Sequence, residues 1–313
     1  MRVLVTGATG FVGSHLAEAL LHAGHGVVVT LRGVSDPRWL TGLQVERVAL
    51  DLAAPERTAL ALEGVEAVVH AGGITRASLP EAFTRVNVDG TRALLRAAAD
   101  AGVPRFLLVS SLAARGPDGV DGPTSDYGRS KLAAERLAAG FAATLDVTVL
   151  RLAAVYGPRD RDLLPLFRLA KRGALLLPPR AARLQPVFAS DVAELVTGVL
   201  ERSIGFGPWP VAEPRSYRWQ ELPAALAAAL GRSVRAFHAP PAAFLTVAAI
   251  AEGAARLRRL APTFDLRRAR DLAVHAYTCD VLATEEATGW RARIDLAEGM
   301  ARTASWYREQ GWL

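Results

Sequence analysis

The chain has 313 residues, of which 51% are hydrophobic and 22% charged, and its formal net charge is +6 at pH 7. This composition indicates a globular protein long enough for a large core and two lobes, and no apolar run approaches the ~20 residues of a membrane span. The arginines that supply the charge are mostly scattered, so we expect neither nucleic-acid binding nor stable insertion into a membrane.

The cysteine and histidine content indicates the redox compartment of the protein and whether a metal site is expected. Cys279 is the only cysteine, which excludes an internal disulfide and fits a reducing compartment. No Cys/His cluster has metal-ligand spacing, so no metal site is expected. Because the N-terminus enters a predicted strand at once, we expect no signal peptide and a cytoplasmic location.

The chain opens with a pattern that is typical of a dinucleotide-binding turn. Arg2–Thr6 is a β-branched apolar run that predicts a buried strand, and the apolar spacing of Phe11–Leu21 predicts a helix. The turn between them carries glycines at three-residue spacing. Glycines let the backbone approach a pyrophosphate, and a helix N-terminus offers unpaired N–H groups and a positive dipole. We expect cofactor contacts from Gly7, Thr9, Gly10, Phe11, Val12 and Gly13.

The end of the second predicted strand, Gly26–Leu31, is where such a fold reads the adenosine ribose. No acidic residue stands there, and Arg32 follows the strand. A guanidinium can hold a 2′-phosphate bidentately, whereas a carboxylate would repel it. The sequence therefore favours NADP over NAD, with a solvated strand-end charge as the plain alternative for Arg32.

The third and fourth predicted strands, Val45–Leu50 and Ala67–His70, also end in candidate cofactor residues. Asp51 and Leu52 follow the third strand near the expected adenine edge. The small residues Ala71, Gly72 and Gly73 follow the fourth strand and would let the chain pass under the cofactor. We interpret His70 as a strand-end core histidine.

The next segments carry polar residues where ligands are expected. Pro80–Ala101 predicts a long helix, and Asn87 inside it carries a helix-propensity penalty that suggests a local role. Arg105–Val109 predicts a fifth strand that ends at Ser110 and Ser111, at the carboxyl edge where ligands lie in a parallel sheet.

A helix predicted at Ser125–Ala143 and a sixth strand at Asp146–Leu150 complete the first half. Because strands and helices alternate six times, we expect an α/β Rossmann fold with a doubly wound parallel sheet. We place the nucleotide-binding domain at residues 1–157 and a smaller α/β substrate lobe mainly at 158–313, with 185–205 returning to the first domain.

The alternation breaks beyond Pro158. A strand is predicted at Gln185–Phe188 and another at Trp209–Val211, and Asp191 with Glu194 resembles a capping box that would begin a helix. The remaining predicted helices span Asp162–Arg172, Trp219–Leu230, Ala242–Leu260 and Asp295–Tyr307. For Ala242–Leu260 we favour helix packing or a dimer contact over membrane association.

Tyr127 and Lys131 are four residues apart on a predicted helix and so share one face. A nearby ammonium favours the phenolate and lowers the tyrosine pKa from its usual ~10. With Ser111 orienting the substrate oxygen, this pattern indicates proton exchange coupled to hydride transfer at a carbon that bears oxygen.

Together these motifs resemble the extended short-chain dehydrogenase/reductase superfamily, of the NAD-dependent epimerase/dehydratase type. The likeness runs nearly end to end and rests on the following segments: Thr6-Gly-Ala-Thr-Gly-Phe-Val-Gly13, Asp51-Leu52, His70-Ala-Gly72, Asn87-Val-Asp-Gly-Thr91, Val109-Ser-Ser111, Tyr127-Gly-Arg-Ser-Lys131, Leu150-Arg-Leu-Ala-Ala-Val-Tyr-Gly-Pro158 and Trp306-Tyr-Arg-Glu-Gln-Gly-Trp-Leu313.

The resemblance implies a role for each matching residue. Tyr127 would be the general acid/base, Lys131 would hold the nicotinamide ribose and lower the tyrosine pKa, and Ser111 would polarise the substrate. Asn87 would support the cofactor and a proton relay. Family members bind substrate in the C-terminal lobe and often form homodimers through the helix that bears the Tyr-Lys pair.

Positions at which the sequence differs from the family's motifs narrow the range of expected activities. Sugar-nucleotide 4,6-dehydratases place Asp-Glu where this chain has Leu112 and Ala113. We therefore expect an NADP-dependent oxidoreductase that interconverts a ketone or aldehyde and an alcohol on a small molecule. The alternatives are an NAD-dependent nucleotide-sugar epimerase and a non-catalytic dinucleotide-sensing regulator, although the intact Tyr127–Lys131 pair disfavours the regulator.

Overall fold

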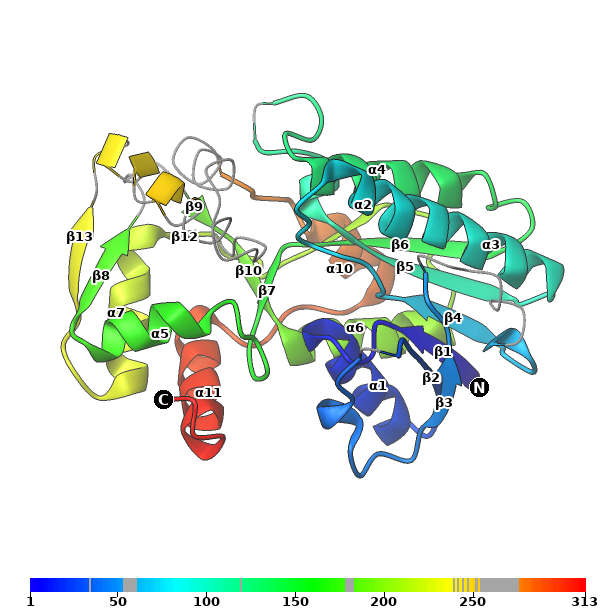
Figure 1. Ribbon diagram of the computed structural model, residues 1–313, viewed down its shortest axis with the longest axis horizontal. Helices are drawn as coiled ribbons and strands as arrows, with labels where there is room; N and C mark the ends of the chain where they lie inside the picture. Colours follow the sequence, from blue (N-terminus) through cyan, green and yellow to red (C-terminus); the bar gives the residue numbers. More distant parts are fainter. Residues whose placement is uncertain are drawn as a thin grey trace.

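A parallel β-sheet forms the centre of the computed structural model (Figure 1), which describes all residues except 34, 53–60, 119, 178–182, 239, 241, 244, 247, 251–252 and 254–275. The order across its seven strands is β11 (Trp209–Val211), β6 (Asp146–Leu152), β5 (Arg105–Ser111), β4 (Ala67–His70), β1 (Arg2–Thr6), β2 (Gly26–Leu31) and β3 (Glu46–Ala49). The predicted Rossmann fold is confirmed.

Helices cover both faces of this sheet (Figure 1). Val3 and Val5 of β1 belong to the same buried cluster as Leu16 of α1 (Phe11–His22) and as residues of α6 (Ala189–Glu201). Leu4 points to the other face and belongs to a cluster with residues of α3 (Gly90–Asp100) and α4 (Asp126–Ala139). Because both faces are covered, the strand is apolar at successive positions rather than at alternate ones.

The chain returns to this sheet after the first half. β7 (Ala154–Tyr156) pairs in parallel with β10 (Pro186–Phe188), which leads directly into α6. α6 packs against α1, and β11 then joins the edge of the central sheet beside β6. The short strand predicted at Trp209–Val211 therefore belongs to the central sheet, a placement that its sequence alone did not indicate.

The helix predicted over Pro80–Ala101 is interrupted by a wider turn. It comprises α2 (Pro80–Phe83), a π-helix over Thr84–Asp89 and α3. Asn87 lies in the π-helical segment, where the Thr91 hydroxyl donates to the Asn87 carbonyl over 2.7 Å. A π-helical turn inside a helix is rare and often lies at a functional site.

Among the described residues, the second lobe includes three longer helices and two pairs of short strands around its own core. The helices are α5 (Leu164–Lys171), α7 (Leu222–Leu230) and α11 (Leu296–Glu309), and they bury Phe167, Leu226 and Tyr307. The strand pairs are β8 (Ala174–Leu177) with β13 (Arg235–His238), and β9 (Arg183–Leu184) with β12 (Tyr217–Arg218). Within the described residues no helix is long and apolar enough to cross a membrane.

Two expectations for the second half need correction. The predicted strand at Gln185–Phe188 begins at Pro186, and the buried side chain of Gln185 bonds to the backbones of Glu213 and Cys279. Asp191 does not cap a helix, since α6 begins two residues earlier. Its buried carboxylate instead accepts from the backbone N–H groups of residues 293 and 294 over 3.2 and 3.0 Å.

Other predicted elements agree more closely or lie partly outside the described residues. The helix predicted at Trp219–Leu230 is a 3₁₀ turn, η5 (Trp219–Glu221), followed by α7, and α11 agrees with its prediction within a turn. α10 (Leu282–Thr288) was not predicted. Of the helix predicted at Ala242–Leu260, every described residue is helical, namely 242–243, 245–246, 248–250 and 253, and the others lie outside the described part.

An aromatic cluster joins the loop after β2 to the end of the chain. Trp39, in the 3₁₀ turn η1 (Arg38–Leu40), lies with its ring centroid 5.4 Å from Trp306 and 6.2 Å from Trp312. The Arg159 guanidinium also lies over the Trp39 ring, 5.6 Å from the ring centroid. The loop after β2 is therefore anchored by the C-terminal helix.

Glu213, just after β11, is a buried carboxyl at the junction of the lobes. It accepts hydrogen bonds from Tyr217 (2.5 Å) and Tyr156 (3.4 Å), and it is 3% exposed. Burial raises the pKa of Glu213 to about 7, although both tyrosine hydrogen bonds oppose the rise. The folded protein thus retains a proton that the unfolded chain loses at lower pH.

This raised pKa predicts that stability falls as the pH rises. Between the ordinary glutamate pKa of 4.5 and about 7 the folded state binds more protons than the unfolded state, so the free energy of unfolding decreases through this window. Replacing Glu213 by Gln should raise that free energy by about 1–3 kcal/mol at pH 8 and by much less at pH 5. Urea unfolding at both pH values measures the effect.

Glu221, which is half-buried and pairs with Arg215 at the surface, provides the control. Glu221→Gln should leave the pH dependence of unfolding as it is in the unaltered protein. A Glu213→Gln curve that runs parallel to the unaltered one would show that Glu213 does not hold the extra proton.

Candidate functional site

The turn between β1 and α1 fits a bound diphosphate. Gly7 has φ +74°, and a Cβ there would lie 2.7 Å from the Ala71 carbonyl oxygen. A Cβ at Gly13 would lie 2.2 Å from the Gly7 oxygen, so α1 contacts the turn backbone directly. α1 begins after Gly10 with no side-chain cap and no acidic residue in its first turn. Its first N–H groups and positive dipole therefore remain for an anion.

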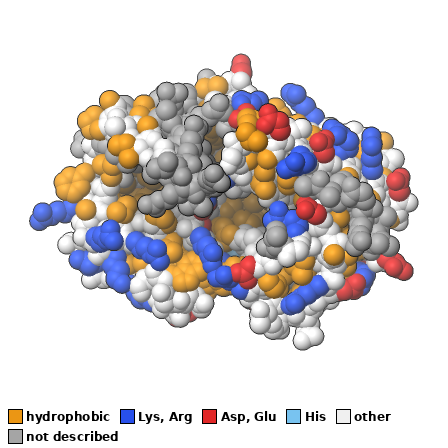
Figure 2. Space-filling model, in the orientation of Figure 1, with side chains coloured by type: hydrophobic (Ala, Val, Ile, Leu, Met, Phe, Trp, Pro, Cys, Tyr) orange, Lys and Arg blue, Asp and Glu red, His pale blue; other side chains and the backbone are white. Residues whose placement is uncertain are grey.

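The other predicted residues of this turn lie around the same helix end. Thr9, Phe11 and Val12 are half-buried and Gly10 is exposed. Figure 2 shows the surface hollowed between the two lobes, beside α1 and α6, with hydrophobic side chains in the depression. The arrangement brings an open helix N-terminus to an apolar hollow, as a dinucleotide site requires.

The chain after β4 passes close to this turn. The Gly72 N–H donates to the Thr6 hydroxyl over 2.9 Å, and a Cβ at Gly72 would lie 2.8 Å from both that oxygen and the Leu52 side chain. Leu52 is buried and Asp51, just after β3, is exposed. The structure therefore brings Gly72 and Leu52 to the β1 turn, with Asp51 at the rim.

A buried chain of hydrogen bonds leads from this turn to the π-helix. Thr6 bonds to His70 Nδ1 over 2.7 Å, and His70 Nε2 bonds to the Thr91 hydroxyl over 2.9 Å. Because the Thr91 hydroxyl donates to the Asn87 carbonyl, it accepts from His70, so Nε2 carries a proton. The Thr6 hydroxyl, which accepts from Gly72, can donate to Nδ1. Burial lowers the pKa of His70 to about 3, so it stays neutral. His70 is a core histidine, as predicted.

Asn87 joins the loop after β4 to the helix α4. Its side-chain oxygen accepts from the Ile74 N–H over 2.8 Å, and its nitrogen donates to the Ile74 carbonyl over 2.9 Å. The same nitrogen donates to the Ser130 hydroxyl over 3.0 Å. With both N–H groups in use, the Asn87 amide holds the loop and the helix at a fixed separation.

Lys131 is buried beneath the end of β5. Its ammonium donates to the Val109 carbonyl over 2.6 Å, and burial lowers the pKa of Lys131 to about 8. Glu135, one helical turn further along α4, opposes this shift. The Glu135 carboxylate is itself held by Arg151, with nitrogen–oxygen distances of 2.6–3.2 Å, and by the Ser110 hydroxyl.

Ser111 and Tyr127 lie where β5 and α4 approach each other. The Ser111 hydroxyl accepts from the Ala113 N–H over 3.2 Å, which fixes the turn after β5. A Cβ at Gly128 would lie 2.3 Å from the Ala113 oxygen, so glycine allows α4 to contact that turn. Tyr127 is half-buried, and its ring centroid lies 6.3 Å from that of Phe83.

The four residues predicted to be catalytic thus lie on three neighbouring elements. Ser111 is on β5, Tyr127 and Lys131 are on α4, and Asn87 is in the π-helix. Sequence reasoning missed three residues that support them, which are Ser130, Glu135 and Arg151. It placed Ser110 at the ligand edge of the sheet, whereas the buried Ser110 hydroxyl donates to Glu135. Glu135 carried a usable signal, because it lies four residues after Lys131 and so shares its helix face. The partner Arg151 lies on another strand and carried none.

Arg32 and Gly73 lie at the outer parts of the site. Arg32 is exposed at the end of β2, and its backbone N–H donates to the Ser35 hydroxyl over 3.1 Å. Its neighbour Arg38 is paired with Asp36, whereas no ion pair to Arg32 occurs among the described residues. Gly73 is also exposed, and a Cβ there would lie 2.9 Å from the Asn87 side-chain oxygen.

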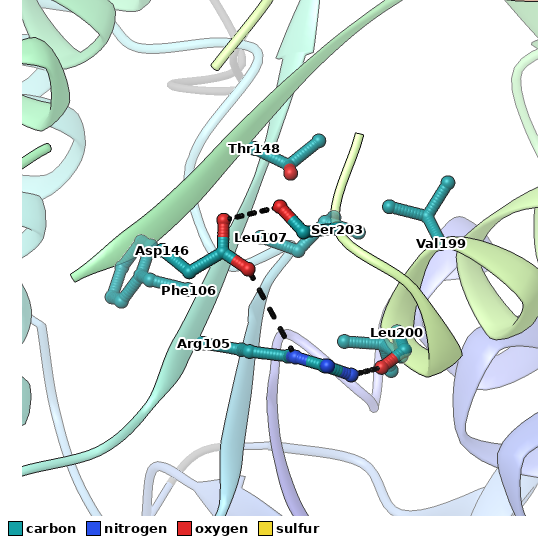
Figure 3. A pocket seen from close by; sticks show the side chains of 8 residues that line it. All are labelled: Arg105, Phe106, Leu107, Asp146, Thr148, Val199, Leu200 and Ser203. Atoms are coloured by element: carbon teal, nitrogen blue, oxygen red, sulfur yellow. Dashed lines mark hydrogen bonds and ion pairs between the residues drawn. The ribbon is translucent and has the colours of Figure 1, made fainter. Parts of the chain in front are cut away.

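A separate small pocket lies at the opposite edge of the sheet (Figure 3), where β5 and β6 begin. Asp146 accepts from Ser203 over 2.8 Å and lies 3.9 Å from Arg105, which also donates to the Leu200 carbonyl. Because these polar groups satisfy one another and lie at the amino ends of the strands, the pocket is not the candidate site.

Comparisons with known proteins agree with this geometry. The sequence profile of the NAD dependent epimerase/dehydratase family matches residues 3–207. Ceramide reductase of Caulobacter vibrioides is 35% identical over 314 aligned residues, which cover 99% of this chain and 96% of that protein.

Solved structures align over the same length. MoeE5 in complex with UDP-glucuronic acid and NAD is 27% identical, with a TM-score of 0.78 and coverage of 99% of this chain and 100% of that chain. DesIV, a dTDP-glucose 4,6-dehydratase from Streptomyces venezuelae with NAD and TYD bound, is 28% identical, with a TM-score of 0.78 and coverage of 100% and 98%.

The Asn87 bridge predicts a stability effect that needs no ligand. Asn87→Ala removes three hydrogen bonds and takes the side-chain partner from both the N–H and the carbonyl of the half-buried Ile74, so the free energy of unfolding should fall by about 2–4 kcal/mol. Ser130→Ala removes one of these bonds and should cost about 1 kcal/mol. Urea unfolding of the two variants compares them, and equal losses would mean that the Ile74 contacts contribute little.

Proposed function

The chain belongs to the NAD dependent epimerase/dehydratase family, and on this basis we propose that it is an NADP-dependent oxidoreductase that interconverts a carbonyl compound and an alcohol. Its extended short-chain dehydrogenase/reductase motifs agree with this membership. The observation that carries the proposal is the buried Lys131 ammonium, held on the Val109 carbonyl one helical turn from Tyr127. A buried ammonium near Tyr127, together with a glycine turn that fits a diphosphate, supports a role in proton transfer.

We assign each residue of the site a role in carbonyl reduction. When bound, the reduced cofactor supplies the hydride that the carbonyl carbon receives. Ser111 donates a hydrogen bond to the carbonyl oxygen and orients it, and Tyr127 transfers its proton to that oxygen, which yields the alcohol. Lys131 stabilises the phenolate that remains on Tyr127 and binds the ribose next to the reacting ring. In the oxidation direction Tyr127 takes the proton back.

The substrate class that best fits is a ceramide-like lipid bearing a ketone. The support is the near-full-length likeness to a protein named ceramide reductase, at 35% identity. The residues after Ser111 agree, because Leu112 and Ala113 leave no acid for the elimination that a sugar 4,6-dehydratase performs. NADPH oxidation by a panel of long-chain ketones and sugar nucleotides tests the assignment directly.

A second candidate is an NAD-dependent nucleotide-sugar epimerase. It is favoured by the full-length structural likeness to MoeE5 with UDP-glucuronic acid and NAD. An epimerase returns its cofactor to the starting state in each turnover, so it would convert a UDP-sugar without net change in NADH absorbance. Bulk consumption of NADPH by a ketone excludes this alternative. A non-catalytic dinucleotide sensor, the third candidate, would bind cofactor and show neither activity.

We further propose a homodimer in the cytoplasm. The single cysteine, Cys279, fits a reducing compartment. The resemblance to the extended short-chain dehydrogenase/reductase superfamily supports a dimer contact on α4, the helix that bears Tyr127 and Lys131. Size-exclusion chromatography with light scattering measures the oligomeric state.

Replacing Tyr127 by Phe should abolish turnover while it leaves cofactor affinity almost unchanged. Loss of a positioned proton donor costs roughly 10²–10⁴-fold in rate, whereas the ring contact with Phe83 remains. NADPH fluorescence titration measures binding and the fall in NADPH absorbance measures turnover. A variant that keeps its full rate would remove Tyr127 from the proton transfer.

Replacing Arg32 by Ala should weaken NADPH binding about tenfold or more, because a charge-assisted contact to the 2′-phosphate is lost, and it should change NADH binding little. Parallel fluorescence titrations with both cofactors give the ratio. Arg96, exposed on α3, is the control, and Arg96→Ala should affect neither cofactor. Equal losses for NADPH and NADH in Arg32→Ala would reject the phosphate contact.

A further inference from the structure

The substrate lobe exposes apolar side chains that the proposed reaction does not use. Leu176 of β8 and Phe237 of β13 are register partners and are 42% and 56% exposed. Leu169 of α5 is 46% exposed, and Ile250, in a nearby stretch of the sequence, is 67% exposed. Figure 2 shows hydrophobic side chains over β8 and β13 at the left end of the molecule.

The two strands explain why this face is exposed. In β8, Leu175 and Leu177 point inward and are buried, whereas Leu176 lies on the opposite face of the strand. α5 contacts β8, and both α5 and α7 contribute to the core beneath. In the described part of the chain no element is packed over the outer side of Leu176 and Phe237. Contiguous exposed apolar groups of this kind mark interaction sites.

Basic residues surround these apolar side chains. The exposed cations are Arg168, Lys171, Arg172, Arg232 and Arg235. Arg235 begins β13, and Arg232 donates to the Lys171 carbonyl, so the cations of α5 and those before β13 lie close together. The sequence contains no Asp or Glu in 163–185 or in 222–251. Figure 2 shows Lys and Arg side chains below the strands, over α5.

We propose that this apolar-basic face, formed by Leu169, Leu176 and Phe237 with the five cations, docks the protein on an anionic phospholipid surface. Cations next to an anionic leaflet each strengthen binding roughly fivefold, and the effect falls away within a Debye length. Leu and Phe side chains enter the boundary between headgroups and acyl chains. Docking of this kind is peripheral and requires no spanning helix.

The charge pattern favours a lipid surface over other partners. In a two-fold dimer through this face, the same cations would meet one another, and like charges would repel. Nucleic acid would use the cations but would leave the exposed Leu176 and Phe237 without apolar contacts. An anionic bilayer offers both a negative surface and an apolar layer beneath it, so it matches both parts of the face.

This docking is a binding property and does not depend on the reaction proposed above. If the substrate is a ceramide-like lipid, docking would hold the substrate lobe at the surface where such a lipid resides. Vesicle binding is therefore measured on the full chain without substrate, and NADPH binding is measured separately. The two proposals can then fail independently.

The test is cosedimentation with vesicles of phosphatidylcholine alone and of equal parts phosphatidylcholine and phosphatidylglycerol. We expect binding to the anionic vesicles only, and weaker binding as salt is added. Phe237→Ser should weaken it roughly tenfold or more, from the lost apolar burial. Combining Lys171→Gln with Arg235→Gln should weaken it by a similar factor.

Two variants at other exposed positions are the controls. Leu282→Ser removes an apolar side chain that is 54% exposed on α10, and Arg291→Gln removes a cation that is 68% exposed. Both should bind vesicles like the unaltered chain, and all variants should retain the melting temperature and NADPH affinity. No binding to anionic vesicles, equal binding to neutral ones, or equal losses in the controls would overturn the proposal. So would a dimer that dissociates in Phe237→Ser.

Discussion

The site depends on one buried path of hydrogen bonds that runs across the sheet. It begins at Thr6, beside the glycine turn, and passes through His70 and Thr91 to Asn87. From Asn87 it continues to Ser130, on the helix that carries Tyr127 and Lys131. Every donor on this path has an acceptor, so the diphosphate turn and the helix α4 are fixed relative to each other before any ligand binds.

The sequence was most informative where structure depends on neighbours in the chain. Gly7 and Gly13 were recognisable because a strand precedes them and a helix follows, and the Tyr127–Lys131 pair was recognisable from helical spacing. Asp191 was misread because its sequence resembles a cap, while its carboxylate binds a backbone about a hundred residues away. The Glu135–Arg151 pair was missed for the same reason. Long-range partners leave no periodic pattern for local reasoning to detect.

The two lobes also differ in how much of their function the sequence reveals. Cofactor chemistry needs a few residues in fixed geometry, and these form short motifs such as Tyr127 to Lys131. Substrate recognition needs only a surface of suitable shape and polarity. The second lobe has its own apolar core around Phe167 and Tyr307, and its exposed face was apparent only when β8 and β13 were seen side by side.

The tilted packing of Trp39 against Trp306 and Trp312 has a consequence for observing the protein. The loop that follows β2 begins at Arg32 and contains Trp39. A rearrangement of this loop therefore changes the surroundings of all three indoles. Since indole emission responds to its environment, the chain contains an intrinsic optical reporter near Arg32, the residue proposed to contact the cofactor phosphate. Cofactor binding in the proposed site would be followed through these tryptophans, without labelling the protein.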